Sequence, residues 1–142
     1  MYWLAGWDIG FPEKNYIPIE SLLRIDIEIG PDKMVLAHMG GWKDWDRVSE
    51  YLAGSRYYFD TAFAIGKVNA RPDLPAPMLT DMLSDDDFTN LCKKHGINKI
   101  LFGTDSPWSD QKEYVDKINS LDFSDYEKEC ILCNNARELL DI

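Results

Sequence analysis

"KMVLAHMGGWKDWDRVSEYLAGSRYYFDTAF" (residues 33–63) contains a complete strand–helix–strand unit. The apolar run at 33–38 predicts a strand, and 44–54 has a helical pattern that ends at a glycine, which is typical of a helix terminus. The aromatic run at 56–63 predicts a second strand. Two strands joined by a helix favour a parallel pair with a right-handed crossover.

The same alternation extends along the rest of the chain. Strands are predicted at 2–6, 33–38, 56–63 and 99–103, and helices at 18–30, 44–54, 85–96, 110–121 and 125–140. The last three helices are preceded by the expected capping residues Ser84, Ser109 and Ser124. The proline-rich stretch 66–79 has no periodicity and predicts a long loop, a kind of segment that often carries function. The pattern therefore predicts an α/β fold with a parallel sheet buried on both faces.

Composition and charge restrict the class of protein. The 142 residues, 45% of them hydrophobic, are enough for one domain with a core. The formal net charge of −10 at pH 7 disfavours nucleic acid and anionic membranes as partners, because phosphate binding needs clustered Lys and Arg. The sequence shows no recognisable secretion signal and no long apolar run, so we expect a cytoplasmic protein.

The cysteines and one histidine are interpreted as structural. Cys92, Cys130 and Cys133 form an odd and sparse set, which fits a reducing compartment. Cys130 and Cys133 make a C-x-x-C pattern inside a predicted helix, without a second pair, and this favours helix packing over metal binding. His95 lies near a predicted helix end, where we also expect a structural role.

Polar side chains occur where each predicted strand ends. Asp8, His38, Asp60 and Asp105 follow or end the four strands in turn. The carboxyl ends of parallel strands share one edge of the sheet, so these side chains are expected on a single rim, as a metal site or an acid–base pair requires. The alternative is that each aspartate caps a helix or turn, with Asp60 in a hydrogen-bonding role with Thr61, and that the histidine is a hydrogen-bonded residue beside a tight turn.

Several neighbours of His38 have two open interpretations. Trp42 lies near the rim and is a candidate substrate contact, whereas Trp45 falls in the helical pattern and is expected to pack. The amides of Gly40 and Gly41 precede a helix and could meet a substrate carboxylate, or could simply form a tight turn.

Four segments resemble a known family: "KMVLAHMGGW" (33–42), "YYFDTAFAIG" (57–66), "HGINKILFGTDSPWSDQ" (95–111) and "NNARELL" (134–140). They are similar to the carboxyl-terminal half of the amidohydrolase-related proteins, metal-dependent TIM-barrel enzymes that include aminocarboxymuconate-semialdehyde decarboxylase. The resemblance implies a single domain over 1–142, a partial TIM barrel of about four βα units that correspond to barrel strands five to eight. The amino-terminal half of the barrel is then lacking, as in a truncated chain.

The resemblance also implies roles for individual residues. His38 falls on the histidine that contacts the metal or activates its bound water, and Asp105 on the aspartate that binds the metal and takes a proton from water. The implied cofactor is a divalent ion, zinc first. The expected substrate is a small molecule with a carboxylate or amide group, and Trp42, Asp60 and Asp8 are its candidate contacts.

Two departures from the family pattern leave a second function open. Leu4 stands where relatives have a histidine ligand, and no His-X-His strand is present because His38 and His95 are the two histidines of the chain. Tight metal binding by this chain alone is therefore not expected, since catalytic zinc usually has three protein ligands. The alternatives are a hydrolase or decarboxylase, incomplete as a catalyst by itself, and a non-catalytic half-barrel or assembly module.

The chain length suggests a protein partner. A complete TIM barrel takes roughly 250 residues, and four parallel strands do not close into a barrel. We therefore expect a homo-oligomer or a complementing half-barrel to cover the open sheet.

Overall fold

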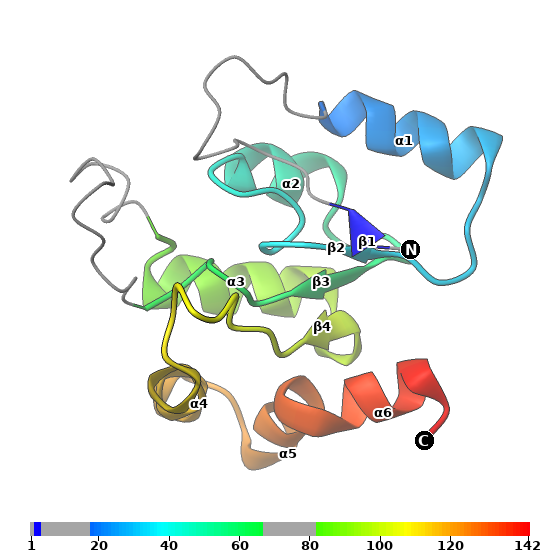
Figure 1. The fold of residues 1–142 in the computed structure, drawn as a ribbon. Coiled ribbons are helices and arrows are strands. Elements are labelled where there is room, and N and C mark those ends of the chain that lie inside the picture. Colours follow the sequence, from blue (N-terminus) through cyan, green and yellow to red (C-terminus); the bar gives the residue numbers. More distant parts are fainter. Residues whose placement is uncertain (1, 4–17, 67–81) are drawn as a thin grey trace.

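The computed structural model describes residues 2–3, 18–66 and 82–142 (Figure 1). The described strands and helices are β1 (Tyr2–Trp3), α1 (Ile19–Glu28), β2 (Val35–Leu36), α2 (Trp45–Tyr51), β3 (Tyr58–Asp60), α3 (Asp85–His95), β4 (Ile100–Leu101), α4 (Gln111–Ser120), α5 (Asp125–Glu129) and α6 (Asn135–Leu140). A 3-10 turn (Ile97–Lys99) precedes β4, and a π-helical turn (Cys130–Asn134) joins α5 to α6. The predicted alternation of strands and helices is confirmed.

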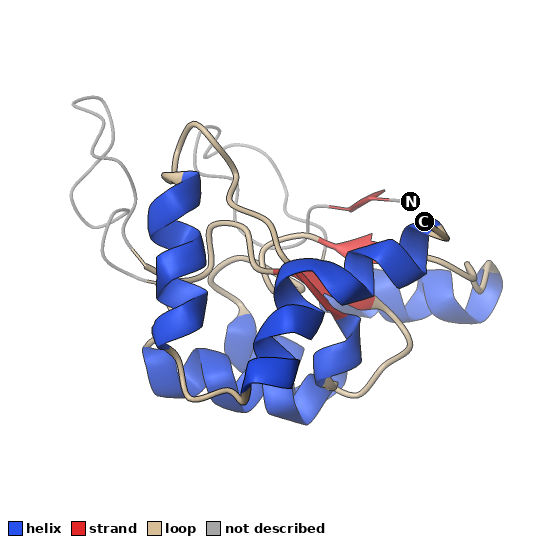
Figure 2. Ribbon diagram, turned by 90° about the horizontal axis from the view of Figure 1, so that it is seen from below, coloured by secondary structure: helices blue, strands red, loops and turns tan. Residues whose placement is uncertain are grey.

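The four strands form one parallel sheet with the order β1-β2-β3-β4. Each strand is followed by at least one helix, and in Figure 2 most of the helical ribbon lies on one side of the strands. This is the arrangement that repeated right-handed βα crossovers produce, because each helix returns the chain across the same face of the sheet. The predicted α/β class and the parallel sheet are confirmed.

The core lies between the sheet and its helices. The strand register places Leu36 beside Phe59 and Phe59 beside Ile100, and all three side chains are fully buried. Their helical partners in the core cluster include Leu22, Val48, Phe88, Ile118 and Ile131. Burying one such side chain stabilises the fold by about 1.5–3 kcal/mol relative to exposure, so this layer fixes which face of each strand points to the helices.

Two of the three predicted helix caps are confirmed. Ser84 precedes α3, and its hydroxyl accepts a hydrogen bond from the Asp87 amide at 3.1 Å. Ser124 precedes α5 in a capping box, in which the Glu127 carboxylate accepts from the Ser124 amide at 2.8 Å. Both caps satisfy amides that the first helical turn leaves without a partner in the helix.

The predicted cap at Ser109 is wrong. Asp110 is the residue that caps α4, because its Oδ1 accepts from the Glu113 amide at 2.9 Å. The side chain of Ser109 is buried instead, and its hydroxyl has no hydrogen-bond partner within the described part of the chain. Because Ser109 is buried in the folded chain, the next residue, Asp110, caps the helix.

The last predicted helix is interrupted. A π-helical turn occupies Cys130–Asn134, and it contains the C-x-x-C pattern. Cys130 is buried and Cys133 is exposed, so the two thiols belong to different environments. Directly after the turn, the buried Asn135 amide donates to the carbonyls of Ile97 and Ile100 at 2.6 and 2.7 Å, which ties this helix to the start of β4.

Other sequence expectations lie outside the described residues. These are the extension of the first strand over 4–6, Leu4 and Asp8, and nearly all of the predicted loop at 66–79. Among the residues that are described, no helix is long and apolar enough to cross a membrane.

Candidate active site

The carboxyl ends of β2, β3 and β4 meet at one edge of the sheet, and the loops that follow them lie on the same side in Figure 1. His38 follows β2, Asp60 ends β3 and Asp105 follows β4. Neighbouring strands are about 4.8 Å apart, so the ends of β2 and β4, from which the loops carrying His38 and Asp105 start, are roughly 10 Å apart, with the end of β3 between them. Asp8, the fourth predicted rim residue, lies outside the described part of the chain.

His38 has an unusual backbone conformation that its neighbours hold. Its φ of 56° is in the left-handed region, which costs a residue with a side chain roughly 1 kcal/mol. The His38 amide donates to Asp60 Oδ1 at 2.9 Å, and the His38 carbonyl accepts from Trp45 Nε1 at 2.9 Å. Because hydrogen bonds engage both of its peptide groups, this conformation is fixed by tertiary structure.

The His38 imidazole has a defined tautomer. Nδ1 lies 2.9 Å from the carbonyl oxygen of Ala62. A carbonyl oxygen can only accept, so Nδ1 carries the hydrogen and Nε2 carries the lone pair. Phe63 packs edge-on against the ring, with the two centroids 6.2 Å apart. The half-buried imidazole can therefore bind a metal ion or take a proton through Nε2.

Asp60 is buried, with 4% of its surface exposed. Its Oδ1 accepts from the amides of His38 and Ala62, at 2.9 and 3.0 Å. The Asp60 carbonyl also accepts from the Met39 amide at 2.7 Å. Through its side chain and main chain, Asp60 joins the loop after β2 to the turn after β3.

Asp105 lies in the loop after β4 and is exposed. Its φ is 54°, and its carbonyl accepts from the Trp108 amide at 3.0 Å, which closes a turn that contains the cis Ser106–Pro107 peptide bond. Two residues before Asp105, Gly103 is tied to the end of β3 by the side chain of Thr61. The structure thus anchors the start of the loop and presents the carboxylate beyond it to the surface.

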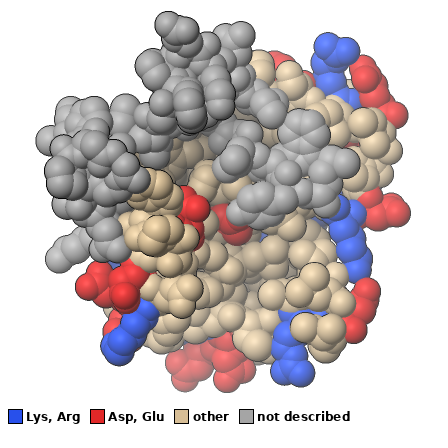
Figure 3. Space-filling model, in the orientation of Figure 1, with Lys and Arg blue, Asp and Glu red and all other residues tan. Residues whose placement is uncertain are grey.

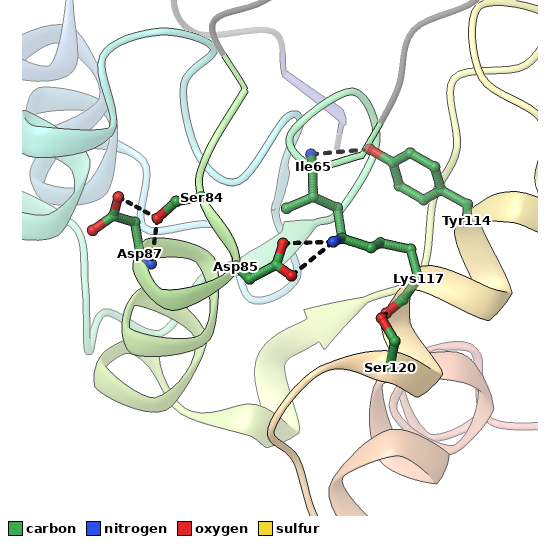
Figure 4. A network of polar contacts seen from close by, with 7 residues as sticks. All are labelled: Ile65, Ser84, Asp85, Asp87, Tyr114, Lys117 and Ser120. Atoms are coloured by element: carbon green, nitrogen blue, oxygen red, sulfur yellow. Dashed lines mark hydrogen bonds and ion pairs between the residues drawn. The ribbon is translucent and has the colours of Figure 1, made fainter.

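Tyr114 reaches from α4 to the underside of this rim (Figure 4). Its hydroxyl donates to the Thr61 carbonyl at 3.1 Å and accepts from the amides of Ala64 and Ile65 at 3.0 and 3.2 Å. Burial raises the pKa of Tyr114 to about 12, and the negative charges of Asp60 and Asp105 add to this effect. Tyr114 is therefore a neutral hydrogen-bonding support for the turn after β3.

Trp42 lies beside the histidine, and 4% of its surface is exposed. Its ring packs on Phe63 with the centroids 5.7 Å apart, and Lys43 Nζ lies 4.9 Å from the indole centroid. The indole Nε1 is buried and has no hydrogen-bond partner within the described residues. This N–H is a candidate donor to a ligand, because a buried donor without a partner is energetically costly.

The two glycines form a turn. The Gly40 amide donates to the Ala37 carbonyl at 3.1 Å, and the Gly41 amide to the His38 carbonyl at 3.3 Å. Gly40 has a φ of 85°, and a Cβ there would lie 2.9 Å from Val48 Cγ1. The tight-turn interpretation therefore holds, since the turn itself uses both amides.

His95 is buried away from the rim, as predicted for a structural residue. Its ring stacks on Phe59 with the centroids 3.7 Å apart. Nε2 lies 2.9 Å from the Tyr57 carbonyl, and Nδ1 accepts from the Gly54 amide at 3.2 Å. Burial lowers the pKa of His95 to about 4, and the nearby charge of Lys99 acts in the same direction.

Charged side chains of both signs alternate around the face seen in Figure 3. Ion pairs connect α1 to the rest of the fold, among them Arg47 with Glu20 and Arg56 with Asp26. These pairs are substantially exposed, so solvent screens them and they contribute little to stability.

The fold and the rim define a class of protein, a parallel βα array with its polar groups at the carboxyl ends of the strands. The amidohydrolase family model matches residues 31–142, which is most of the chain, and the chain belongs to this family. The resemblance found in the sequence is thus confirmed. None of the curated proteins matches the chain in sequence.

The chain is similar in fold to parts of larger proteins whose structures are solved. A Pseudomonas putida protein assigned as a 2-pyrone-4,6-dicarboxylic acid hydrolase aligns with a TM-score of 0.58 and 16% identity, over 87% of this chain and 48% of that one. The manganese-bound 5-carboxyvanillate decarboxylase of Novosphingobium aromaticivorans aligns with a TM-score of 0.54 and 11% identity, over 85% of this chain and 38% of that one. A Staphylococcus aureus protein assigned as an amidohydrolase aligns with a TM-score of 0.51 and 21% identity, over 78% of this chain and 35% of that one. The chain spans about a third to a half of their lengths, and the likeness establishes the fold.

The donor atoms at the rim fit part of a metal site. An imidazole nitrogen and a carboxylate oxygen are ordinary ligands of zinc and related divalent ions. The described residues contain no group of three or more His, Cys, Asp or Glu side chains that could hold a metal ion. His38 and Asp105 therefore offer two ligands at most from this part of the chain.

Several residues that shape the rim were not predicted from the sequence. They are Thr61, the carbonyl of Ala62, the indole N–H of Trp45 and the hydroxyl of Tyr114. For Thr61, the sequence suggested a hydrogen-bonding role with Asp60, but not the two bonds to Gly103. The other three act through backbone groups or from distant helices, for which the sequence has no local pattern.

Proposed function

We propose that this chain supplies the His38 and Asp105 side of a metal-dependent active site that hydrolyses or decarboxylates small substrates with a carboxylate or amide group. The observation that carries the proposal is the His38 imidazole, fixed at the sheet rim with its lone pair on Nε2. Support comes from the family and from similar structures whose names describe decarboxylation of 5-carboxyvanillate and dihydroxybenzoic acid, both solved with manganese.

The chain's own groups have separate tasks in this proposal. A divalent ion, zinc or manganese, would lower the pKa of bound water and polarise the substrate. His38 would hold the ion through Nε2, and Asp105 would hold it or take the proton from water through its carboxylate. The remaining ligands would come from outside the described residues or from another chain.

Substrate contacts complete this proposal. Trp42 is the best supported, because its buried indole N–H has no partner in the described structure and its ring lies against the aromatic cluster beside His38. Asp8 lies outside the described residues and stays a prediction. Asp60 also stays a prediction as a contact, although one of its oxygens already binds two backbone amides.

A second candidate function is a half-barrel that acts as an assembly module. The observation that favours it is the limited ligand set of the described residues. Val35 and Tyr58, paired across β2 and β3, are only half-buried and alternate with the core residues of these strands. In this proposal the four βα units match strands five to eight of a barrel, and a second copy or a complementing half-barrel covers that face.

Metal analysis tests the first function. The purified full chain is incubated with zinc or manganese, desalted, and its metal content measured by mass spectrometry. If residues of this chain outside the described ranges supply the remaining ligands, the wild type should retain stoichiometric metal that is lost in His38→Ala and in Asp105→Ala. The control Asp122→Ala removes a carboxylate that is fully exposed and should leave the metal content unchanged.

The opposite results are equally informative. A wild-type chain that retains no metal rules out autonomous metal-dependent catalysis. Analytical ultracentrifugation of the same sample then tests the second function, for which a dimer or a larger species is expected. A monomer that stays folded and soluble would contradict the assembly module.

A further inference from the structure

One carboxylate oxygen connects the two backbone segments that the His38 side chain also joins. Asp60 Oδ1 accepts from the His38 amide at 2.9 Å and from the Ala62 amide at 3.0 Å. The Ala62 carbonyl in turn accepts from His38 Nδ1 at 2.9 Å. The Asp60 carboxylate, the His38 imidazole and amide, and the Ala62 amide and carbonyl therefore form a closed ring of hydrogen bonds.

The Asp60 and Ala62 part of this ring is shielded from water. Asp60 has 4% of its surface exposed and Ala62 also 4%. Hydrogen bonds to a carboxylate are stronger than neutral ones, and low local polarity strengthens them further. The Asp60 side chain is thus placed to set both the position of His38 and the distance from its ring to the Ala62 carbonyl.

We propose that Asp60 is a positioning residue for His38, whose carboxylate holds the turn that selects the Nδ1–H tautomer and leaves the lone pair on Nε2. The significance for catalysis rests on the proposed function, since Nε2 is the atom assigned to the metal or proton. The positioning itself does not require that function, because it is a property of the folded chain.

The conformation of His38 favours this role over that of a simple turn cap. A φ of 56° is uncommon for residues other than glycine, although histidine adopts it more often than most, and it persists where the surroundings fix it. Asp60 holds the amide side of His38, and Trp45 Nε1 holds the carbonyl side. Removing the Asp60 carboxylate therefore breaks the hydrogen bond to the His38 amide and, at the same time, the one to the Ala62 amide.

The chain has an internal reference for the measurement. His95 has the opposite tautomer, because Nε2 donates to the Tyr57 carbonyl while Nδ1 accepts from the Gly54 amide. His38 and His95 are the two histidines of the sequence, so a spectrum of ¹⁵N-labelled histidine contains two imidazole patterns with reversed assignments. The His95 pattern reports whether the core around it is folded.

The experiment is ¹⁵N nuclear magnetic resonance of the labelled full chain without added metal, at about pH 8, above the ordinary histidine pKa of roughly 6.5. Wild type should show His38 with a protonated Nδ1 and an unprotonated Nε2, and His95 with the reverse. In Asp60→Ala the two His38 resonances should converge as the tautomers mix. Asp60→Asn keeps an acceptor oxygen and should retain the wild-type pattern, as should the control Asp122→Ala.

The proposal is overturned if wild-type His38 is a tautomer mixture or carries its hydrogen on Nε2. It is also overturned if Asp60→Ala keeps the Nδ1–H pattern. Should the His95 pattern show that Asp60→Ala is unfolded, Asp60→Ser replaces it, because a hydroxyl is too short to reach both amides, and the same two outcomes decide. A chain that binds no metal but shows the expected tautomers would refute metal-dependent catalysis by this chain alone and leave the positioning role intact.

Discussion

Thr61 and Gly103 exchange two hydrogen bonds across the ends of β3 and β4. The Thr61 hydroxyl donates to the Gly103 carbonyl at 2.9 Å and accepts from the Gly103 amide at 3.0 Å. A backbone amide and carbonyl are thus satisfied by one fully buried side chain at the point where the sheet ladder ends. This link fixes the start of the loop that carries Asp105.

Replacing Thr61 by valine should destabilise the protein by about 1–3 kcal/mol, because the methyl group leaves the Gly103 amide and carbonyl without their partner. Thr61→Ser keeps the hydroxyl and is the matched control, with a smaller loss from the missing methyl group. Urea unfolding monitored by tryptophan fluorescence measures both. Equal midpoints for wild type and Thr61→Val would show that water replaces the hydroxyl without cost.

Gly40 and Gly54 provide a second matched pair. Both have a left-handed backbone, with φ of 85° and 81°. A Cβ at Gly40 would lie 2.9 Å from Val48 and 3.0 Å from Phe59, whereas at Gly54 the nearest atom is 4.0 Å away. Gly54→Ala should therefore lower the free energy of unfolding by about 1 kcal/mol, because only the backbone is strained. Gly40→Ala should lower it by about 2–4 kcal/mol, because overpacking of the core is added. Denaturant unfolding of the two variants checks this, and similar losses would contradict the packing argument.

Much of the fold could be predicted because burial determines its pattern. The apolar runs at 33–38 and 56–63 contain the shorter strands Val35–Leu36 and Tyr58–Asp60, with Leu36 and Phe59 side by side in the core, and the elements follow the expected order. Boundaries were less predictable. Ser109 and Asp110 are both good caps, and only the burial of Ser109 in the folded chain decides between them.

The candidate site was predictable in position but not in geometry. The rule that function gathers at the carboxyl ends of parallel strands located His38, Asp60 and Asp105. The left-handed conformation of His38 could not be read from the sequence, because it depends on hydrogen bonds to Asp60 and Trp45 that form only in the tertiary structure. The same is true of the backbone carbonyl that selects the imidazole tautomer.

Tyr114→Phe should destabilise the protein by about 1–3 kcal/mol, since the Ile65 amide loses this partner, whereas the Ala64 amide and Thr61 carbonyl keep their 3.3 Å bond to each other. The pKa of the hydroxyl is raised to about 12, so its contribution is complete below the unfolded value of about 10 and is lost as the pH rises toward 12. The difference in the free energy of unfolding between wild type and Tyr114→Phe should thus shrink as the pH rises above about 10. Denaturant unfolding at neutral pH and at about pH 11 measures this.

Tyr51→Phe is the control for this experiment. Tyr51 is half exposed, so removal of its hydroxyl should change the free energy of unfolding by no more than about 0.5 kcal/mol. If both tyrosine variants lose the same small amount, the Tyr114 hydroxyl does not support the turn in solution.

His95 should make the protein sensitive to mild acid. Its pKa is lowered to about 4 in the folded chain, against about 6.5 when unfolded, so the folded state favours the neutral imidazole. The unfolded chain then binds more protons between these values, and stability falls as the pH drops from about 6.5 to about 4. A shift of this size corresponds to a loss of roughly 3 kcal/mol over the interval.

His95→Gln isolates this contribution from that of the carboxylates, which titrate in both proteins. The variant should be less stable at neutral pH, because it loses the stacking on Phe59 and the hydrogen bond to Tyr57, but its stability should fall less steeply in acid. Urea midpoints measured at intervals between about pH 7 and 4 give both slopes. Parallel slopes would mean that the buried imidazole is protonated without unfolding, and that the ring is more accessible to water in solution than its packing against Phe59 indicates.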